Sequence, residues 1–213
     1  MGIPMRLQYS ITAIGSVVLQ AAANTLGSGA VAAMTAAGRI GNFLACPFDA
    51  MGSTMATYGG QNVGAGRLER LGQGLKSCVL LGAGYSVIAF VISIFLGRPL
   101  AVLFMDGSET AIIADVRLFL LLNTLFYFPL ALVNIIRFLI QGMGFPKFAI
   151  LAGVFEMIAR AAAGFLLVPV LGFTGVCLGS PIAWIMADAF LIPAYFHVSR
   201  KLQRKFEPAG AAA

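Results

Sequence analysis

The feature that most constrains this chain is a set of long apolar stretches that hold very few charges. Cys78 to Leu96, Phe148 to Val168 and Val176 to Phe196 are the clearest of them. A helix that rises about 1.5 Å per residue crosses a hydrocarbon core of about 30 Å within such a stretch. The alternation of polar and apolar residues that is typical of membrane β-strands does not occur. We therefore predict an all-α, polytopic integral membrane protein.

Composition supports the same fold class. Hydrophobic residues make up 60% of the chain and charged residues 10%, whereas soluble domains carry about 25% charged residues. The length of 213 residues fits about six spans with short connections. We predict a six-helix transmembrane lobe over residues 1–206 and a disordered C-terminal tail over residues 207–213. The predicted spans are Met5 to Leu26, Ala30 to Gly59, Cys78 to Leu96, Ile112 to Gln141, Phe148 to Val168 and Val176 to Phe196.

The basic residues predict the orientation of the chain in the membrane, because Lys and Arg in short loops favour the cytoplasmic side. Along the predicted spans they fall on one side, and that set also accounts for most of the net charge of +6. We therefore expect both termini in the cytoplasm, a location in the plasma membrane or the cell inner membrane, and no nucleic-acid partner. The residues are Arg6, Arg67, Arg70, Lys76, Lys147, Arg200, Lys201, Arg204 and Lys205.

The chain contains few groups that could support enzyme chemistry. His197 is the only histidine, and the three cysteines fall within or at the end of apolar segments. The glycine-rich run from Gly64 to Gly66 lacks the lysine and the hydroxyl of a phosphate-binding loop. We therefore predict no enzyme activity, no catalytic residues, no metal site and no cofactor.

Polar residues at membrane depth are the most informative positions, because each costs a few kcal/mol unless it meets a partner or a water-filled cavity. Glu156 and Arg160 stand four residues apart near the middle of the fifth predicted span, a spacing that allows an ion pair within one helix. That pair is either a packing element or part of a pathway for ligands or protons. The candidate substrate or ion-pathway residues are Gln20, Asn24, Arg39, Asn42, Asn123, Asn134, Arg137, Glu156, Arg160 and Asp188.

Two prolines fall inside predicted spans that also carry polar residues. Pro129 lies in the fourth span and Pro47 in the second, and each lacks the backbone donor that an unbroken helix needs. We expect both helices to bend, either to open toward a cavity or as ordinary packing.

Five stretches of the chain are distinctive when taken together. They are Gly2 to Pro4, Ala30 to Ile40, Gly60 to Arg70, Gln141 to Pro146 and Pro169 to Trp184. These stretches resemble the C-terminal half of the multidrug and toxin extrusion family. The resemblance implies a twelve-helix protein of two six-helix lobes related by a pseudo-twofold axis along the membrane normal, of which this chain would be the C-terminal lobe. It also implies export of organic cations or other amphipathic compounds by rocking one lobe against the other.

The chain departs from some members of that family, which place carboxylates for cation coupling on the first and fourth helices of this lobe. Here Met5 to Leu26 contains no acid, and Asp115 lies only at the outer end of the fourth span. The coupling ion, sodium or a proton, therefore stays open, with Glu156 and Asp188 as the best protonatable candidates.

The leading hypothesis is one lobe of a cation-coupled drug antiporter, with a cavity lined by the first, second and fourth spans. Its expected partners are membrane lipid, an amphipathic substrate, and either an N-terminal lobe in the same protein or a second six-helix chain. A flippase of a lipid-linked precursor is the nearest alternative, and a basic, phosphate-attracting cavity would favour it. A non-transporting membrane scaffold subunit is the alternative from a different class.

Overall fold

The computed structural model describes residues 2–104 and 107–206, and over these ranges it is helical with no strand, which confirms the all-α fold class. The predicted disordered tail, residues 207–213, lies outside the described residues. The elements are α1 (Gly2–Asn24), α2 (Ser28–Gly64), α3 (Glu69–Val102), α4 (Thr110–Leu125), α5 (Tyr127–Gly142), α6 (Pro146–Ala162), the π-helical turn η1 (Ala163–Leu167), α7 (Val168–Leu171) and α8 (Phe173–Phe206).

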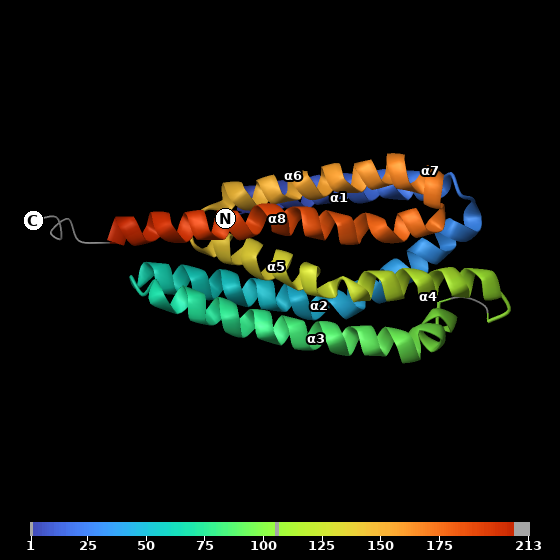
Figure 1. Cartoon of the computed structure of the whole chain (residues 1–213), viewed down its shortest axis with the longest axis horizontal. Helices are drawn as coiled ribbons and strands as arrows, with labels where there is room; N and C mark the ends of the chain where they lie inside the picture. Colours follow the sequence, from blue (N-terminus) through green and yellow to red (C-terminus); the bar gives the residue numbers. More distant parts are fainter. Residues whose placement is uncertain (1, 105–106, 207–213) are drawn as a thin grey trace, which may run out of the picture.

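The described elements form six long rods that follow the six predicted spans (Figure 1). The fourth rod consists of α4 and α5, and the fifth consists of α6, η1 and α7. The structural elements extend beyond most of the predicted boundaries, because several helices continue past the apolar region that marks a span in the sequence.

Not every rod is equally apolar. Within the described residues, three uninterrupted rods are long and hydrophobic enough to cross a membrane, namely α3, the fifth rod and α8. The bent pair of α4 and α5 would make a fourth such span. Of the remaining rods, α1 contains a shorter apolar helix over Ser10–Asn24, and α2 carries Arg39, Asn42 and Asp49 along its length.

The break in the fourth rod confirms the bend predicted there and places it upstream of the proline. The axes of α4 and α5 differ by 52°, and Phe126 separates the two helices. Pro129 has no N–H to donate, and its ring crowds the carbonyl of Leu125, four residues before it. The helix therefore ends at Leu125 and starts again at Tyr127.

The second predicted bend, at Pro47, has a different outcome. Helix α2 continues through Pro47 without a break in its helical assignment, although its course changes direction along its length in Figure 1. Two tyrosine hydroxyls donate to α2 carbonyls close to this proline: Tyr85 to Leu44 at 2.9 Å and Tyr127 to Gly41 at 3.0 Å. The backbone before Pro47 is thus held by neighbouring helices.

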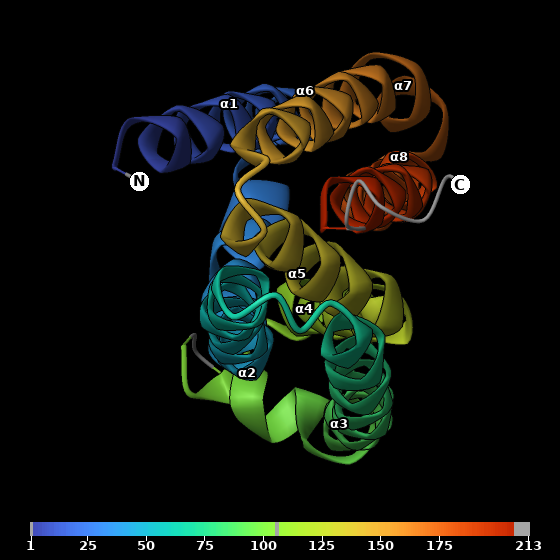
Figure 2. The same ribbon diagram turned by 90° about the vertical axis from the view of Figure 1, so that its left-hand side faces the viewer.

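The rods pack in two groups. Helix α1 packs against α6, and α6 packs against α8, whereas α2 packs against α5 and α3 against α4 (Figure 2). Helix α5 joins the groups by contacting α2, α6 and α8. The closest approach is between α2 and α5, where a Cβ atom on Gly142 would overlap the carbonyl group of Ala56.

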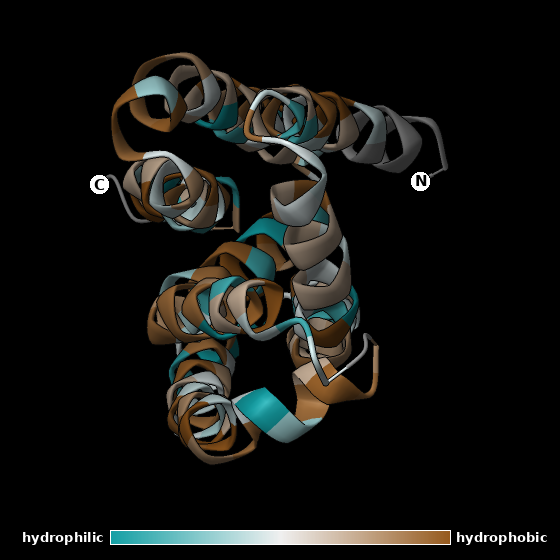
Figure 3. Cartoon of the chain, turned by 90° about the vertical axis from the view of Figure 1, so that its right-hand side faces the viewer, coloured by the Kyte–Doolittle hydropathy of each residue, from teal (hydrophilic) through white to brown (hydrophobic). Residues whose placement is uncertain are grey.

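Many large apolar side chains of the rods are exposed, and Figure 3 shows hydrophobic residues, in brown, along the helices. Helix α3 is the clearest case, because Leu80, Val87, Ile94 and Phe95 on it are all exposed. Exposed side chains of this size suit contact with lipid tails rather than water. The fold therefore places an apolar surface outside and, as described next, a charged cluster inside.

Candidate functional site

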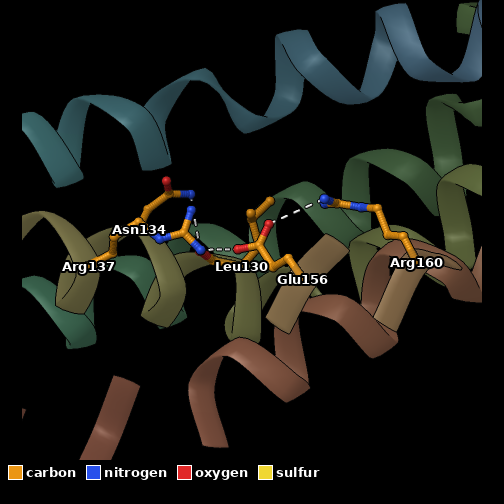
Figure 4. A network of polar contacts seen from close by, with 5 residues as sticks. All are labelled: Leu130, Asn134, Arg137, Glu156 and Arg160. Carbon is orange, nitrogen blue, oxygen red and sulfur yellow. Dashed lines mark hydrogen bonds and ion pairs between the residues drawn. The ribbon is translucent and has the colours of Figure 1, made fainter. Parts of the chain in front are cut away.

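A buried cluster of charges lies where α5 meets α6. The carboxylate of Glu156 on α6 accepts from the guanidinium of Arg137 on α5 and, at 3.3 Å, from that of Arg160 one turn further along α6 (Figure 4). Glu156 is 2% exposed, and the two arginines are 6% exposed. One carboxylate thus bridges two buried cations.

The local sequence explains this arrangement. Glu156 and Arg160 share one face of α6 through their spacing of four residues, which is the pair predicted from the sequence. Arg137 comes from a different helix, brought back by the tight connection after Gly142. Gly144 in that connection has φ of +93°, a left-handed conformation that glycine adopts without strain. The cluster therefore joins two helices that are neighbours in sequence.

Asp188 on α8 extends the cluster. It is 7% exposed and lies close enough to Arg137 and Glu156 to interact with both charges. Its Oδ1 atom is buried and has no hydrogen-bond partner among the described residues. Asp188 thus lies beside the Arg137–Glu156 pair but forms no ion pair with either residue in the described structure.

A cavity of about 340 Å³ opens beside this cluster. Six of the sequence-predicted site residues line it: Asn42, Asn123, Asn134, Arg137, Glu156 and Arg160. They come from α2, α4, α5 and α6. The prediction that the first, second and fourth spans line the cavity is therefore incomplete. Helix α6 also supplies two charged residues to the lining, and α8 supplies Ser180 and Trp184.

Aromatic side chains form one wall of this cavity. Tyr127 and Trp184 both line it, with their ring centroids 6.1 Å apart in an edge-on arrangement. Behind Tyr127, Phe48 packs edge-on at 5.5 Å, and Tyr85 packs on Phe48 at 5.2 Å. The row thus runs from α3 through α2 and α5 to α8, and two of its members, Tyr127 and Trp184, add aromatic surface to the cavity lining.

Helix α2 carries a polar stripe, which we define as Thr35, Arg39, Asn42, Cys46, Asp49 and Ser53. All six side chains are exposed, and their spacing of three and four residues places them on one helix face. Arg39 and Asp49 make no ion pair within the described residues. Asn42 and Asp49 also line the cavity, so the cavity opens onto this stripe.

Four predicted residues do not line the cavity. Gln20 and Asn24 lie on α1, half-buried and exposed respectively, and Arg39 lies on the polar stripe. Asp188 lies behind the cavity, beside the charged cluster. These placements follow from helix packing. A polar side chain at membrane depth needs water or a polar partner, and it can find one in a cavity, on a polar stripe or against a buried polar group.

Sequence reasoning missed several lining residues, among them Thr12, Phe119, Tyr127, Ser180 and Trp184. Aromatic residues are ordinary in an apolar span, so no sequence signal separated Tyr127 from the others. Trp184, the single tryptophan of the chain, was the one signal available. In the described residues, no group of three or more His, Cys, Asp or Glu side chains is placed to hold a metal ion.

Comparison with known proteins adds an independent observation. A protein-family model described as MatE matches residues 4–166. A comparison with curated proteins gives no match.

Solved transporter structures share the fold of this chain. A Vibrio cholerae MATE transporter, VcmN, in its bent form has a TM-score of 0.87 and 19% identity, over 96% of this chain and 46% of that one. An outward-facing multidrug resistance MATE family transporter of the MOP superfamily has a TM-score of 0.85 and 19% identity, with coverage of 97% and 46%. An inward-facing one has a TM-score of 0.80 and 18% identity, with coverage of 99% and 48%. This chain thus spans less than half the length of each, consistent with one lobe.

Proposed function

Since this chain belongs to the MatE family, we propose that it is the C-terminal lobe of a secondary active exporter of drugs or other amphipathic organic compounds. The export is coupled to inward movement of a cation, sodium or a proton. The observation that carries the proposal is the cavity of about 340 Å³, whose lining combines the Arg137, Glu156 and Arg160 cluster with the aromatic rings of Tyr127 and Trp184. Small-molecule sites have this mixture of apolar walls and few convergent polar groups.

The polar stripe of α2 supports a role in a water-filled pathway. Arg39 and Asp49 are exposed although α2 runs among membrane-spanning rods, and an exposed charge in hydrocarbon costs several kcal/mol. A polar stripe of this kind is stable when it is in contact with water or with a second polar surface. The other lobe of a two-lobe transporter, supplied by a longer product or by a second chain, would provide such a surface or enclose such water.

The charge balance of the cavity favours an exporter of amphipathic compounds over a flippase of a lipid-linked phosphate. Arg137 and Arg160 are offset by Glu156 and Asp49 in the lining itself. A site for a phosphate needs an excess of basic groups. Trp184 and Tyr127 also line the cavity, and aromatic rings suit planar organic cations through cation–π contact.

The test of transport is efflux of ethidium, a planar organic cation, from source cells that lack the gene. Restoring the wild-type gene is expected to restore efflux. Glu156→Gln and Asp49→Asn are expected to remove most of it at equal protein level in the membrane, whereas Glu109→Gln, an exposed acid at the start of α4, serves as the control. Normal efflux by Glu156→Gln would support a purely structural role for the cluster and the scaffold hypothesis.

The coupling ion is tested in membrane vesicles with one imposed gradient at a time. A sodium gradient and a proton gradient are applied separately, and ethidium movement is followed. Movement with one gradient only names the ion, and movement with neither would contradict coupled antiport.

The lobe assignment is tested by size. An antibody raised against the sequence Arg200 to Pro208 is used to blot membranes of the source cell. A band near twice 22.3 kDa supports a two-lobe protein, whereas a band near 22.3 kDa supports a six-helix chain that pairs with a second one.

A further inference from the structure

Two arginines face one small cavity at the end of the bundle away from the C-terminal end of α8. Arg98 near the end of α3 and Arg117 on α4 line a cavity of about 220 Å³ together with Thr110, Ile113 and Ala114. Helices α3 and α4 lie side by side there (Figure 1). Neither arginine makes an ion pair within residues 2–104 and 107–206. The cavity is thus lined by two arginines that form no ion pair with any described residue.

Asp115 and Glu109 form no ion pair with these arginines among the described residues, and Asp106, which the sequence sets against Arg98, lies outside the described residues. Asp115 lies on another face of α4, where it interacts with Cys177 of α8. Glu109 is exposed and forms no ion pair with either arginine in the described structure. Thr110, which lines the cavity, is the first residue of α4, so the partial positive charge of the helix N-terminus adds to that of the arginines.

The depth of the two arginines matches the headgroup region of a membrane. Arg98 lies two residues beyond Leu96, the end of the apolar stretch that predicts the third span. Arg117 lies seven residues into α4, about 10 Å from its start by helical rise. The Cγ atom of Arg117 lies close to Gly97 of α3, the residue before Arg98. Arginines at this depth reach toward phosphate groups at the interface.

A second, apolar cavity also lies between α3 and the fourth rod. It measures about 350 Å³ and is lined on the α3 side by Ala83, Val87 and Phe90, and on the other side by Leu125 and Phe128. Phe90 precedes Arg98 by eight residues, and Leu125 follows Arg117 by eight residues, so both helices place the cavities about 12 Å apart. That spacing is within the length of one extended acyl chain.

We propose that the α3–α4 groove binds one anionic phospholipid, with its phosphate on Arg98 and Arg117 and an acyl chain in the apolar cavity near Phe90 and Leu125. Arginine suits this role because its planar donors can pair with two phosphate oxygens at once. The apolar cavity distinguishes a lipid from free phosphate, since inorganic phosphate has nothing to place there. The partner is thus a structural lipid of the membrane, separate from any transported compound.

The test uses the full-length protein that carries this sequence, purified in detergent and stripped of lipid. Binding of dioleoylphosphatidylglycerol is measured by native mass spectrometry. The double variant Arg98→Gln, Arg117→Gln is expected to lower the bound fraction at least about tenfold, because each arginine contributes charge-assisted hydrogen bonds. The matched control Arg67→Gln, Arg70→Gln removes the same charge at the opposite end of the bundle and is expected to bind as the wild type does.

The tail half of the site is tested separately. Ala83→Trp keeps both arginines but fills the apolar cavity, and it is expected to weaken phosphatidylglycerol binding while leaving the binding of inorganic phosphate unchanged. This variant also keeps the proposal testable if the arginine variant fails to fold.

Four results would overturn the proposal. The first is wild-type retention of phosphatidylglycerol by the double arginine variant. The second is an equal loss of binding in the control. The third is unchanged lipid binding by Ala83→Trp. The fourth is inorganic phosphate displacing the lipid completely, because that would indicate a simple anion site.

Discussion

Replacing Glu156 with Gln removes the one carboxylate that holds two buried guanidiniums. Arg137 and Arg160 are each 6% exposed, so neither side chain can turn to water when its partner loses its charge. Breaking a buried ion pair from one side costs about 3–5 kcal/mol, because the remaining charge is left without compensation. The Arg137–Glu156 and Arg160–Glu156 ion pairs share one carboxylate, so the free-energy costs of breaking them do not add. We expect Glu156→Gln to lower the free energy of unfolding by about 3–5 kcal/mol.

The arginines should differ in their contributions. Arg137 pairs across two helices, whereas Arg160 pairs within α6 at 3.3 Å. Losing Arg137 therefore removes a tertiary contact and also the base that lies near Asp188. We expect Arg137→Gln to destabilise the protein more than Arg160→Gln does.

The assay is unfolding of purified full-length protein in mixed micelles, titrated with SDS and followed by circular dichroism. The control is the triple variant Arg137→Met, Glu156→Leu, Arg160→Met, which removes all three charges together. It should recover most of the loss, since apolar side chains replace a buried ion cluster at little cost. The reasoning is refuted if Glu156→Gln unfolds within about 0.5 kcal/mol of the wild type, the range typical of surface changes.

Three further predictions concern packing, a hydrogen bond and solvent access. Gly142→Ala should destabilise the protein by about 1–3 kcal/mol in the same assay, because the added Cβ meets the Ala56 carbonyl group. Gly84→Ala is the control, since Gly84 has open space around it and its substitution should not destabilise the protein. Equal effects of the two substitutions would refute the close approach at Gly142. Tyr127→Phe should cost about 1 kcal/mol through loss of its bond to the Gly41 carbonyl, and an unchanged midpoint would contradict that bond. A water-soluble maleimide should label Cys46 on the polar stripe and should not label the buried Cys78 and Cys177. Cys46→Ser serves as the control. An unlabelled Cys46 would mean that the stripe does not face water.

The sequence could predict the fold class and the rods because hydrocarbon imposes one strong rule. Every backbone polar group must be satisfied within the segment, so a long apolar stretch such as Cys78 to Leu96 has to be a helix. The same rule singled out Glu156 and Arg160, since a charge at membrane depth needs a partner and a spacing of four residues offers one. Those inferences required only positions along the chain.

Tertiary structure alone decided which polar residues meet. Arg137 reaches Glu156 because α5 breaks away from α4 at Phe126 and returns beside α6, and no periodicity encodes that path. Asp188 joins the cluster from α8, about thirty residues further along the chain. Tyr127 and Trp184 became a cavity wall for the same reason.

The sequence by itself therefore determined that the protein lies in a membrane, where its helices run, and which residues must be paired or hydrated. The tertiary structure decided the pairing, the cavity and the groove between α3 and α4. The physical reason is that burial in lipid acts on each segment separately, whereas side-chain contacts between helices depend on breaks, crossing positions and close approaches such as that of Gly142 to Ala56.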